Sequence, residues 1–196
     1  MPLMNFQPII LTGRTIRLEP LTKDHAPDLF ETADESCFRF HGMKPREWSA
    51  EGFRQYVQDA YAFPGRIPYA IIHSETGRAI GSSSYFEVRP SNRGVEIGWT
   101  WISPPHRRTT INPESKFLMM AHAFEDQGAM RVQFKCDARN AQSRRALEKL
   151  GCTLEGVLRR HAVMPDGFIR DNCIYSVIDS EWPMVKRGLE ARIAPD

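Results

Sequence analysis

Apolar and polar residues alternate along seven short stretches of this 196-residue chain, and a period of two predicts β-strands. Turn-forming residues separate these stretches, and the short turns between the three central strands predict an antiparallel meander. The expected strands cover residues 13–20, 69–73, 79–88, 95–102, 132–136, 154–164 and 168–179.

In five other segments the apolar residues recur at helical spacing. These segments are residues 23–36, 49–62, 113–127, 141–150 and 181–193. The third helix joins strands 95–102 and 132–136, so this pair should be parallel, because a crossover returns the chain in the same direction. A mixed sheet with flanking helices is an α+β architecture. The length fits one domain over residues 1–196, with a core at about 13–182 and a short C-terminal helix.

Composition narrows the class of protein. The net charge of +2 is too small for a nucleic-acid binder, so we expect no nucleic-acid partner. No apolar run approaches the roughly 20 residues of a membrane-spanning helix, and the first residues lack the features of a signal peptide. We therefore expect a cytoplasmic protein with no membrane partner. The four cysteines form no CxxC pair, so we interpret them as small buried side chains and expect no metal.

A basic loop follows strand 95–102 and leads directly into a helix. Its sequence is His106-Arg107-Arg108-Thr109-Thr110, and the helix start reads Asn112-Pro113-Glu114, with Asn112 as the expected N-cap and Pro113 as the first helical residue. The free amides and the dipole of a helix N-terminus attract anions, and arginine binds phosphate with a fork of donors. This arrangement predicts a phosphate-binding site. A solvated basic loop is the alternative.

Four segments resemble the GNAT superfamily of N-acetyltransferases, and within it the RimJ/RimL-type ribosomal-protein acetyltransferases. The most specific is DARNAQSRRALEKLGCTLEGVLRR, residues 137–160, and the others are GRTIRLEPL, VEIGWTWI and RDNCIYSVIDSEW. The resemblance extends from Gly13 to about Trp182. It implies a GNAT fold, a mostly antiparallel sheet of about seven strands with a splayed parallel pair, and acetyl-CoA as co-substrate without a metal.

The resemblance also implies where acetyl-CoA binds. The pantetheine would lie between the splayed strands and bond to the backbone of Ile102, and the diphosphate would lie on the basic loop. Asn140 and Ser143 would face the pantetheine and the sulfur, and Arg144 or Arg145 would reach an adenosine phosphate. The expected cofactor-binding residues are Trp101, Ile102, Arg107, Arg108, Thr109, Thr110, Ile111, Asn112, Asn140, Ser143 and Arg144. The chain departs from the family pattern in having threonines where the loop is usually rich in glycine.

The implied reaction is direct attack of an amine on the acetyl thioester in a ternary complex. The amine must lose a proton, and we expect Glu96 to accept it, because it lies on the strand that leads to the acetyl group. His161 and Glu155 are weaker candidates for the base, since the segment Arg160-His161-Ala162 lacks the carboxylate that some RimL-like enzymes place there. Glu96 could also simply stabilise the sheet.

The oxyanion and the leaving thiolate also need partners. The amide of Ile102 is the expected oxyanion donor. Ser143 fits the thiolate by position and Tyr175 by chemistry, although Tyr175 is equally well explained as a core residue.

The acceptor is expected to be a primary amine, either a protein N-terminus or a small molecule. Residues between the first two helices should cover its pocket, and the candidates are Glu35, Phe38 and Phe40. Trp99 and Trp101 are two residues apart on one strand, so they should share a face and pack in the core. The alternative to an enzyme is a non-catalytic CoA-binding sensor or interaction module of the same fold. A homodimer is compatible with either function.

Overall fold

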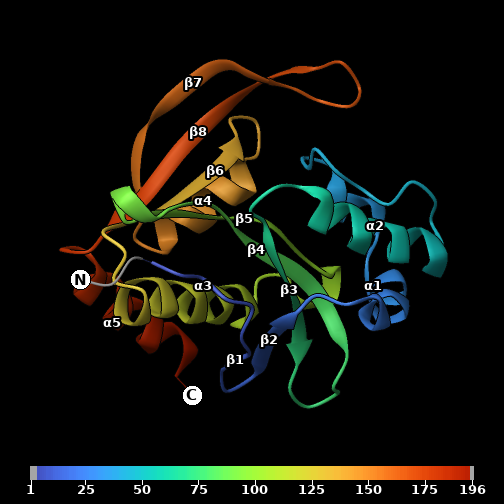
Figure 1. The fold of residues 1–196 in the computed structure, drawn as a ribbon, viewed down its shortest axis with the longest axis horizontal. Coiled ribbons are helices and arrows are strands. Elements are labelled where there is room, and N and C mark those ends of the chain that lie inside the picture. The colour runs from blue at the N-terminus through green and yellow to red at the C-terminus, as the bar shows by residue number, and fades with distance from the viewer. Residues whose placement is uncertain (1–3, 195–196) are drawn as a thin grey trace.

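Residues 4–194, the part of the chain that the computed structural model describes, form an eight-stranded sheet with helices on both faces (Figure 1). The strand order is β1-β2-β3-β4-β5-β6-β8-β7. The strands are β1 Leu11–Thr12, β2 Ile16–Pro20, β3 Ile67–His73, β4 Ala79–Arg89, β5 Gly94–Ile102, β6 Arg131–Asp137, β7 Thr153–Val163 and β8 Ile169–Ile178. Each neighbouring pair is antiparallel except β5–β6, which is parallel. The expected α+β, mostly antiparallel sheet is therefore confirmed, with eight strands instead of about seven.

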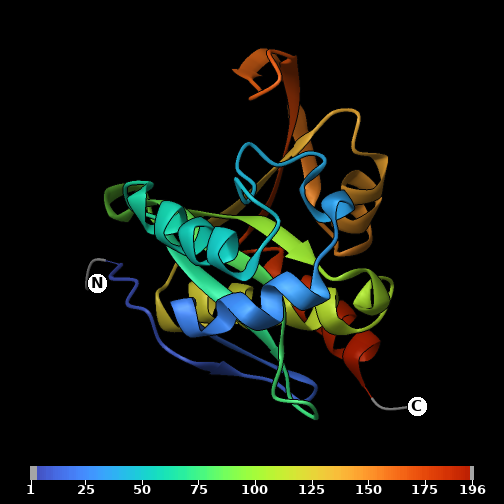
Figure 2. The ribbon, with the colours of Figure 1, turned by 90° about the vertical axis from the view of Figure 1, so that its right-hand side faces the viewer.

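Five α-helices cover the sheet. They are α1 Ala26–Thr32, α2 Ala50–Ala62, α3 Ile111–Ala121, α4 Ala141–Lys149 and α5 Trp182–Ile193. Helix α3 continues as a π-helical turn, His122–Asp126, before Gly128 takes a left-handed conformation with φ 65°. Short 3-10 turns are Lys23–His25, Glu35–Phe38, Pro90–Asn92 and Pro104–His106. Figure 2 views the molecule from the side of α1 and α2, with α3 and α5 behind the sheet.

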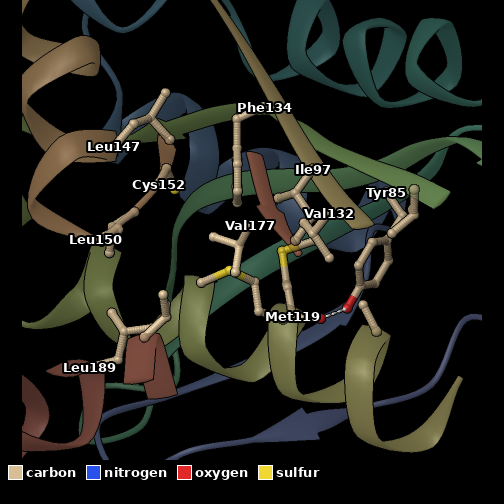
Figure 3. Close-up of a cluster of buried hydrophobic side chains, with 14 of the residues drawn as sticks. Tyr85, Ile97, Met119, Val132, Phe134, Leu147, Leu150, Cys152, Val177 and Leu189 are labelled. Carbon is tan, nitrogen blue, oxygen red and sulfur yellow. Dashed lines mark hydrogen bonds between the residues drawn. The ribbon is translucent and has the colours of Figure 1, made fainter. Parts of the chain in front are cut away.

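Two apolar clusters lie on the two faces of the sheet. The larger one packs the sheet against α3, α4 and α5, and Figure 3 shows part of it, including Met119, Leu147 and Leu189. There the Tyr85 hydroxyl donates to the Met119 carbonyl at 2.6 Å, so this buried polar group is satisfied. The smaller cluster packs the other face against α1 and α2. We call these sides the α3 face and the α2 face.

The structure corrects the first expected strand. Alternation predicts one strand over residues 13–20, but a turn at residues 13–15 separates β1 from β2. The reason is the carboxylate of Glu114, which accepts hydrogen bonds from the backbone amides of Arg14 and Thr15 and from the Thr15 hydroxyl. Glu114 is about 100 residues away in sequence, so no local pattern could indicate this turn.

The structure also divides the first expected helix, residues 23–36. Helix α1 ends at Thr32, where Ala33 and Asp34 are extended, and a separate 3-10 turn begins at Glu35. The Asp34 carboxylate accepts a hydrogen bond from the Ser36 hydroxyl at 2.5 Å. A side chain of this kind offers the backbone a turn in place of a continuing helix.

The start of α3 differs from the expectation that Asn112 caps it. The helix begins at Ile111 after Thr110, and the Ile111 amide donates to the Thr109 hydroxyl at 3.3 Å. Asn112 and Pro113 therefore lie in the first turn. Proline is tolerated there, because the first amides of a helix have no partner within it, so Pro113 does not identify the first residue uniquely.

Strand β5 contains a bulge that reverses its side-chain pattern. Ser84 pairs with Gly98 but Ser82 pairs with Trp101, so β5 holds one extra residue, and Trp99 adopts φ 53°. Before the bulge Ile97 packs on the α3 face, and after it Trp101 packs on the α2 face. Trp99 contacts Phe63 and Phe86 with ring centroids 5.6 and 6.4 Å away. Both tryptophans thus lie on the α2 face, as their spacing predicts, but only Trp101 packs in the core, whereas Trp99 is half-buried outside it.

The parallel pair β5–β6 is short. Its three paired positions join Gly94–Glu96 to residues 131–133, and beyond them the two strands have no common ladder. Strand β5 continues along β4 as far as Ile102, and β6 continues along β8 as far as Asp137. The strands therefore separate after Glu96, which confirms the expected splayed pair.

Lys116 of α3 is buried beneath the bulge of β5. Its ammonium donates to the hydroxyls of Thr100 at 2.6 Å and Ser83 at 3.1 Å, and these two hydroxyls also bond to each other at 2.8 Å. Its partners are thus neutral, and burial lowers the pKa of Lys116 to about 7. The hydrogen bonds of Lys116 hold α3 against the β4–β5 pair, and its ammonium loses a proton more readily than that of an exposed lysine.

We expect Lys116→Met to change how stability depends on pH. The unfolded chain keeps this lysine protonated up to its ordinary pKa of 10.5, whereas the folded protein loses the proton near 7. The wild type therefore gains free energy of unfolding as the pH rises through this window. At pH 7 we expect the wild type to have a smaller free energy of unfolding than Lys116→Met. This difference should shrink by about 2 kcal/mol between about pH 7 and 9. Urea unfolding of both proteins measures this change, and a constant difference would contradict it.

Candidate active site

The basic loop between β5 and α3 is shaped by its own side chains. The Thr109 hydroxyl donates to the His106 carbonyl at 2.7 Å and accepts from the Ile111 amide at 3.3 Å. Arg108 takes the left-handed conformation, φ 65°, that glycine usually supplies. His106 is a loop residue, as expected, with its Nδ1 2.7 Å from the Ser103 hydroxyl. The loop thus turns into α3 without glycine.

Arg107 joins the end of β5 to the turn Glu35–Phe38. Its Nε donates to the Ile102 carbonyl at 2.9 Å, its Nη1 to the Ser36 hydroxyl at 2.8 Å and its Nη2 to the Cys37 sulfur at 3.0 Å. Asp34 lies 3.7 Å from Nη2. The side chain expected to hold a phosphate is therefore engaged with its own chain, and so is the carbonyl of Ile102, the residue whose backbone is expected to bond to pantetheine.

The expected residues of α4 gather at its N-terminus, beside β6. The Asn140 side chain caps the helix by accepting from the Ser143 amide at 3.0 Å. Hydrogen bonding by Ser143 opposes the effect of burial, which raises the pKa of Cys136 on β6 to about 11. Ser143 is thus next to the strand on the far side of the splay from β5.

Tyr175 of β8 has its hydroxyl turned toward α4. This hydroxyl donates to Glu148 at 2.9 Å and accepts from Arg144 Nε at 3.4 Å. The residue is fully buried in the larger apolar cluster, and burial raises the pKa of the phenol. Its proton is therefore held by a carboxylate of α4.

Glu96 is the last paired residue of β5 before the splay and is only 1% exposed. Its Oε2 accepts from Lys135 Nζ at 3.0 Å and from Gln133 Nε2 at 2.9 Å. Burial raises the pKa of Glu96 and outweighs the opposing effect of Lys135. A carboxylate in this state accepts a proton more readily than an exposed glutamate.

A pocket of about 430 Å³ opens beside Glu96 under the β7–β8 hairpin. Gln133 and Lys135, which hold Glu96, also line this pocket. The other lining residues are Glu87, Glu155, Gly156, Leu158, His161 and Ile174. The three candidates for the base thus lie at one pocket. Glu155 and His161 line it, and Glu96 contacts two of its lining residues, Gln133 and Lys135.

The two other candidates for the general base, Glu155 and His161, have different hydrogen-bond partners from those of Glu96. Hydrogen bonds from Ser176 and Arg131 lower the pKa of Glu155, so its carboxylate holds a proton less readily than Glu96. The imidazole Nδ1 of His161 is 2.6 Å from the amide nitrogen of Asn172. Glu96 has the most suitable environment of the three for a base.

The residues expected to cover the acceptor pocket lie in different environments. Phe38 is 4% exposed and packs in the smaller cluster, with its ring 5.2 Å from that of Trp101. Trp101 is itself buried there and donates to the Tyr56 hydroxyl at 3.1 Å. Glu35 is exposed, and the Phe40 carbonyl accepts from Arg170 Nη1 at 3.2 Å.

Sequence reasoning missed three residues close to this region, namely Arg66, Arg170 and His41. Arg66 follows Pro64-Gly65 and reads as a solvated turn residue, yet it is only 5% exposed. Its guanidinium carbon lies 4.6 Å from the centre of the Trp99 ring. No local signal distinguishes it from a surface arginine, because the groups that bury it come from β4 and β5.

Over residues 4–194, no three histidine, cysteine, aspartate or glutamate side chains cluster in a way that could hold a metal ion. None of the helices in that range is long and apolar enough to cross a membrane.

The chain and its fold are similar to known proteins. The family model of the GNAT acetyltransferase domain matches residues 15–153. A putative acetyltransferase of solved structure from T. thermophilus is 39% identical, with 97% of this chain and 100% of that chain covered and a TM-score of 0.91. A GCN5-related N-acetyltransferase from Brucella melitensis is 31% identical, with 99% and 89% covered and a TM-score of 0.92.

RimJ from Mycobacterium smegmatis, solved in complex with CoA-disulfide, is 18% identical, with 93% of this chain and 90% of that chain covered and a TM-score of 0.77. This similarity shows a shared fold and leaves the RimJ/RimL type as a proposal. The GNAT fold binds acetyl-CoA, and the family match covers β5, the basic loop, α3, β6 and α4. The chain therefore belongs to the GNAT acetyltransferase family and is an acetyl-CoA-dependent acetyltransferase.

Proposed function

We propose that this protein transfers the acetyl group of acetyl-CoA to a primary amine by direct attack in a ternary complex, with Glu96 as general base. The acceptor is a small-molecule amine or, as the RimJ/RimL resemblance suggests, a protein N-terminus. The observation that carries the proposal is the buried Glu96 carboxylate, which lies where β5 and β6 separate and beside a pocket of about 430 Å³.

The proposed cofactor site uses both sides of the splay. Pantetheine lies along β5 after Glu96, and the diphosphate lies at the N-terminus of α3, where the amides and the helix dipole favour an anion. Residues 108–112 form this end of the site. Arg107 releases Ser36 and Cys37 to reach the diphosphate, or it stays in place and fixes the loop.

Three groups of the chain interact with the proton of the amine, the oxyanion and the leaving thiolate. The amine nitrogen attacks the thioester carbonyl and its proton passes to Glu96, directly or through water. The amide of Ile102 donates to the oxyanion. Ser143 is the better donor to the leaving thiolate, since the Tyr175 hydroxyl donates to Glu148.

We expect Arg107→Ala to weaken acetyl-CoA binding. The variant loses either a charge-assisted bond to phosphate or the three bonds that fix the loop. Loss of one charge-assisted hydrogen bond should raise the dissociation constant roughly tenfold to a hundredfold. Calorimetric titration with acetyl-CoA measures it, and Arg46→Ala, at a side chain that is 75% exposed, is the matched control. Equal affinity in both variants would show that Arg107 serves neither role.

We expect Glu96→Gln to lower turnover and leave acetyl-CoA affinity near that of the wild type. Removing a general base typically reduces the rate by about 10²–10⁴-fold. The raised pKa of Glu96 also places the acidic limb of the wild-type pH profile above the range of an ordinary glutamate. Activity should fall as the pH drops through that pKa, and Glu96→Gln should lack this limb.

The measurement is thiol release from acetyl-CoA with a panel of primary amines across pH. Glu125→Gln is the control, because Glu125 also pairs with a lysine, Lys186 at 2.8 Å, but lies in the π-helical turn His122–Asp126 after α3. Wild-type turnover and pH profile in Glu96→Gln would exclude Glu96 as the base.

A further inference from the structure

Among residues 4–194, the positive charge of Arg66 is buried on the α2 face with no salt-bridge partner. Arg66 precedes β3, is 5% exposed, and donates from Nε to the Ser84 hydroxyl at 2.9 Å. Within the described part of the chain, its Nη2 has no hydrogen-bond partner. Burial lowers the pKa of Arg66, and Tyr56 partly opposes this effect. An isolated buried cation is unfavourable by several kcal/mol unless something pairs with it.

A second arginine approaches the same region from β8. Arg170 donates from Nη1 to the Phe40 carbonyl at 3.2 Å, and among residues 4–194 its buried Nε has no partner. The charge of Asp137 acts on Arg170, but both oxygens of Asp137 are bound by Arg139, at 3.0 and 2.7 Å. Arg170 is therefore also free to bind an anion.

His41 lies in the segment that both arginines approach: Arg170 donates to the Phe40 carbonyl at 3.2 Å, and Arg66 Nη1 is 4.0 Å from the Met43 sulfur. Burial and the positive charges of Arg66 and Arg170 lower the pKa of His41 to about 4, so its ring is neutral at neutral pH. The positive charges of Arg66 and Arg170 thus meet the same short segment, residues 40–43. We call Arg66, His41 and Arg170 the arginine subsite.

The arginine subsite and Glu96 share a face of the sheet. Arg66 lies over Trp99, Trp99 contacts Phe86, and a Cβ added at Gly98 would meet both the Phe86 ring and Glu96 Oε1, the latter at 3.9 Å. The charge of Glu96 also acts on Arg170. A ligand on this face would thus have the base at one end and two guanidinium groups at the other.

We propose that the arginine subsite binds the carboxylate of the acceptor, so that the acceptor is an amino acid with a free carboxylate and not a protein N-terminus. The inference rests on the proposed function, because it names the acceptor of that same site. A planar guanidinium with unpaired N–H groups matches a carboxylate through two parallel hydrogen bonds. The first residue of a protein has no α-carboxylate to pair with these arginines, because that group forms the peptide bond.

The test compares each of the nineteen standard amino acids that carry a primary α-amine with its own α-amide, by thiol release from acetyl-CoA. We expect the acids to have kcat/KM values roughly tenfold to a hundredfold higher, as for loss of a charge-assisted hydrogen bond. The amide has the less basic amine, so more of it is deprotonated at neutral pH. A preference for the acid therefore cannot arise from amine basicity.

Variants of Arg66 and Arg170 test whether the arginine subsite causes the preference for the acid over the amide. Arg66→Gln and Arg170→Gln should each raise KM for the acid by a similar factor, so that the preference for the acid over the amide is lost. Arg66→Lys should restore part of the binding, because it keeps the charge without the planar fork. Arg54→Gln is the control, at an exposed arginine that pairs with Glu51 at 3.0 Å. If Arg66→Gln does not fold, Arg170→Gln provides the same test at a partly exposed residue.

The outcomes separate this inference from the proposed function. Equal kcat/KM for acids and amides, or turnover of peptide N-termini or phosphorylated amines alone, would overturn the carboxylate subsite and leave acetyl transfer standing. Amino acids that raise the melting temperature of the CoA complex through Arg66, without being acetylated, would support the subsite and contradict the proposed function. Amino acids that neither react nor stabilise the complex would overturn the inference.

Discussion

The separation of β5 from β6 after Glu96 is the constraint on which the rest of the structure depends. A ladder that ends inside a sheet leaves backbone amides and carbonyls without partners, and such groups are unfavourable when buried. In this chain the Ile102 carbonyl is satisfied by Arg107 at 2.9 Å, from the loop that follows the strand. The carbonyl at the end of the open strand is therefore satisfied from within the chain although the β5–β6 ladder does not reach it.

The bulge at Trp99 gives the open strand two different faces. Because β5 gains one residue there, Ile97 and Thr100 lie on the α3 face, whereas Trp99 and Trp101 lie on the α2 face. Lys116 binds Thr100 from one side, and Arg66 lies over Trp99 on the other. The bulge is thus held from both faces, which keeps in place a residue whose φ of 53° is unfavourable for a bulky side chain.

The elements can be predicted because their signals are local. Alternation in β3 to β6 and β8 and helical spacing in α2, α4 and α5 predict boundaries within two residues of those found. The misses have non-local or ambiguous causes. Glu114 creates the turn before β2 from about 100 residues away, and Pro113 is compatible with more than one first residue of α3.

The site can be predicted only in part, for the same reason. Strand position alone predicts that Glu96 lies near the acetyl group, but its burial and its contact with Lys135 depend on β6. The contacts of Arg107 depend on the turn Glu35–Phe38, and the burial of Arg66 depends on β4 and β5. A sequence pattern reports which residues share an element, whereas these properties arise from elements that meet only in the fold.

Three ionisable side chains, Glu96, Lys116 and Arg66, are each no more than 5% exposed and lie on or beside the same strand, β5. Only Glu96 has an oppositely charged partner, Lys135. Apolar residues would be the more stable choice at such positions, since desolvation of a charge is seldom recovered by pairing. Their presence around the bulge is therefore unfavourable for the stability of this part of the sheet. Lys116 reaches β5 from α3 and binds Thr100 on one face of the strand, and Arg66 lies over Trp99 on the other face.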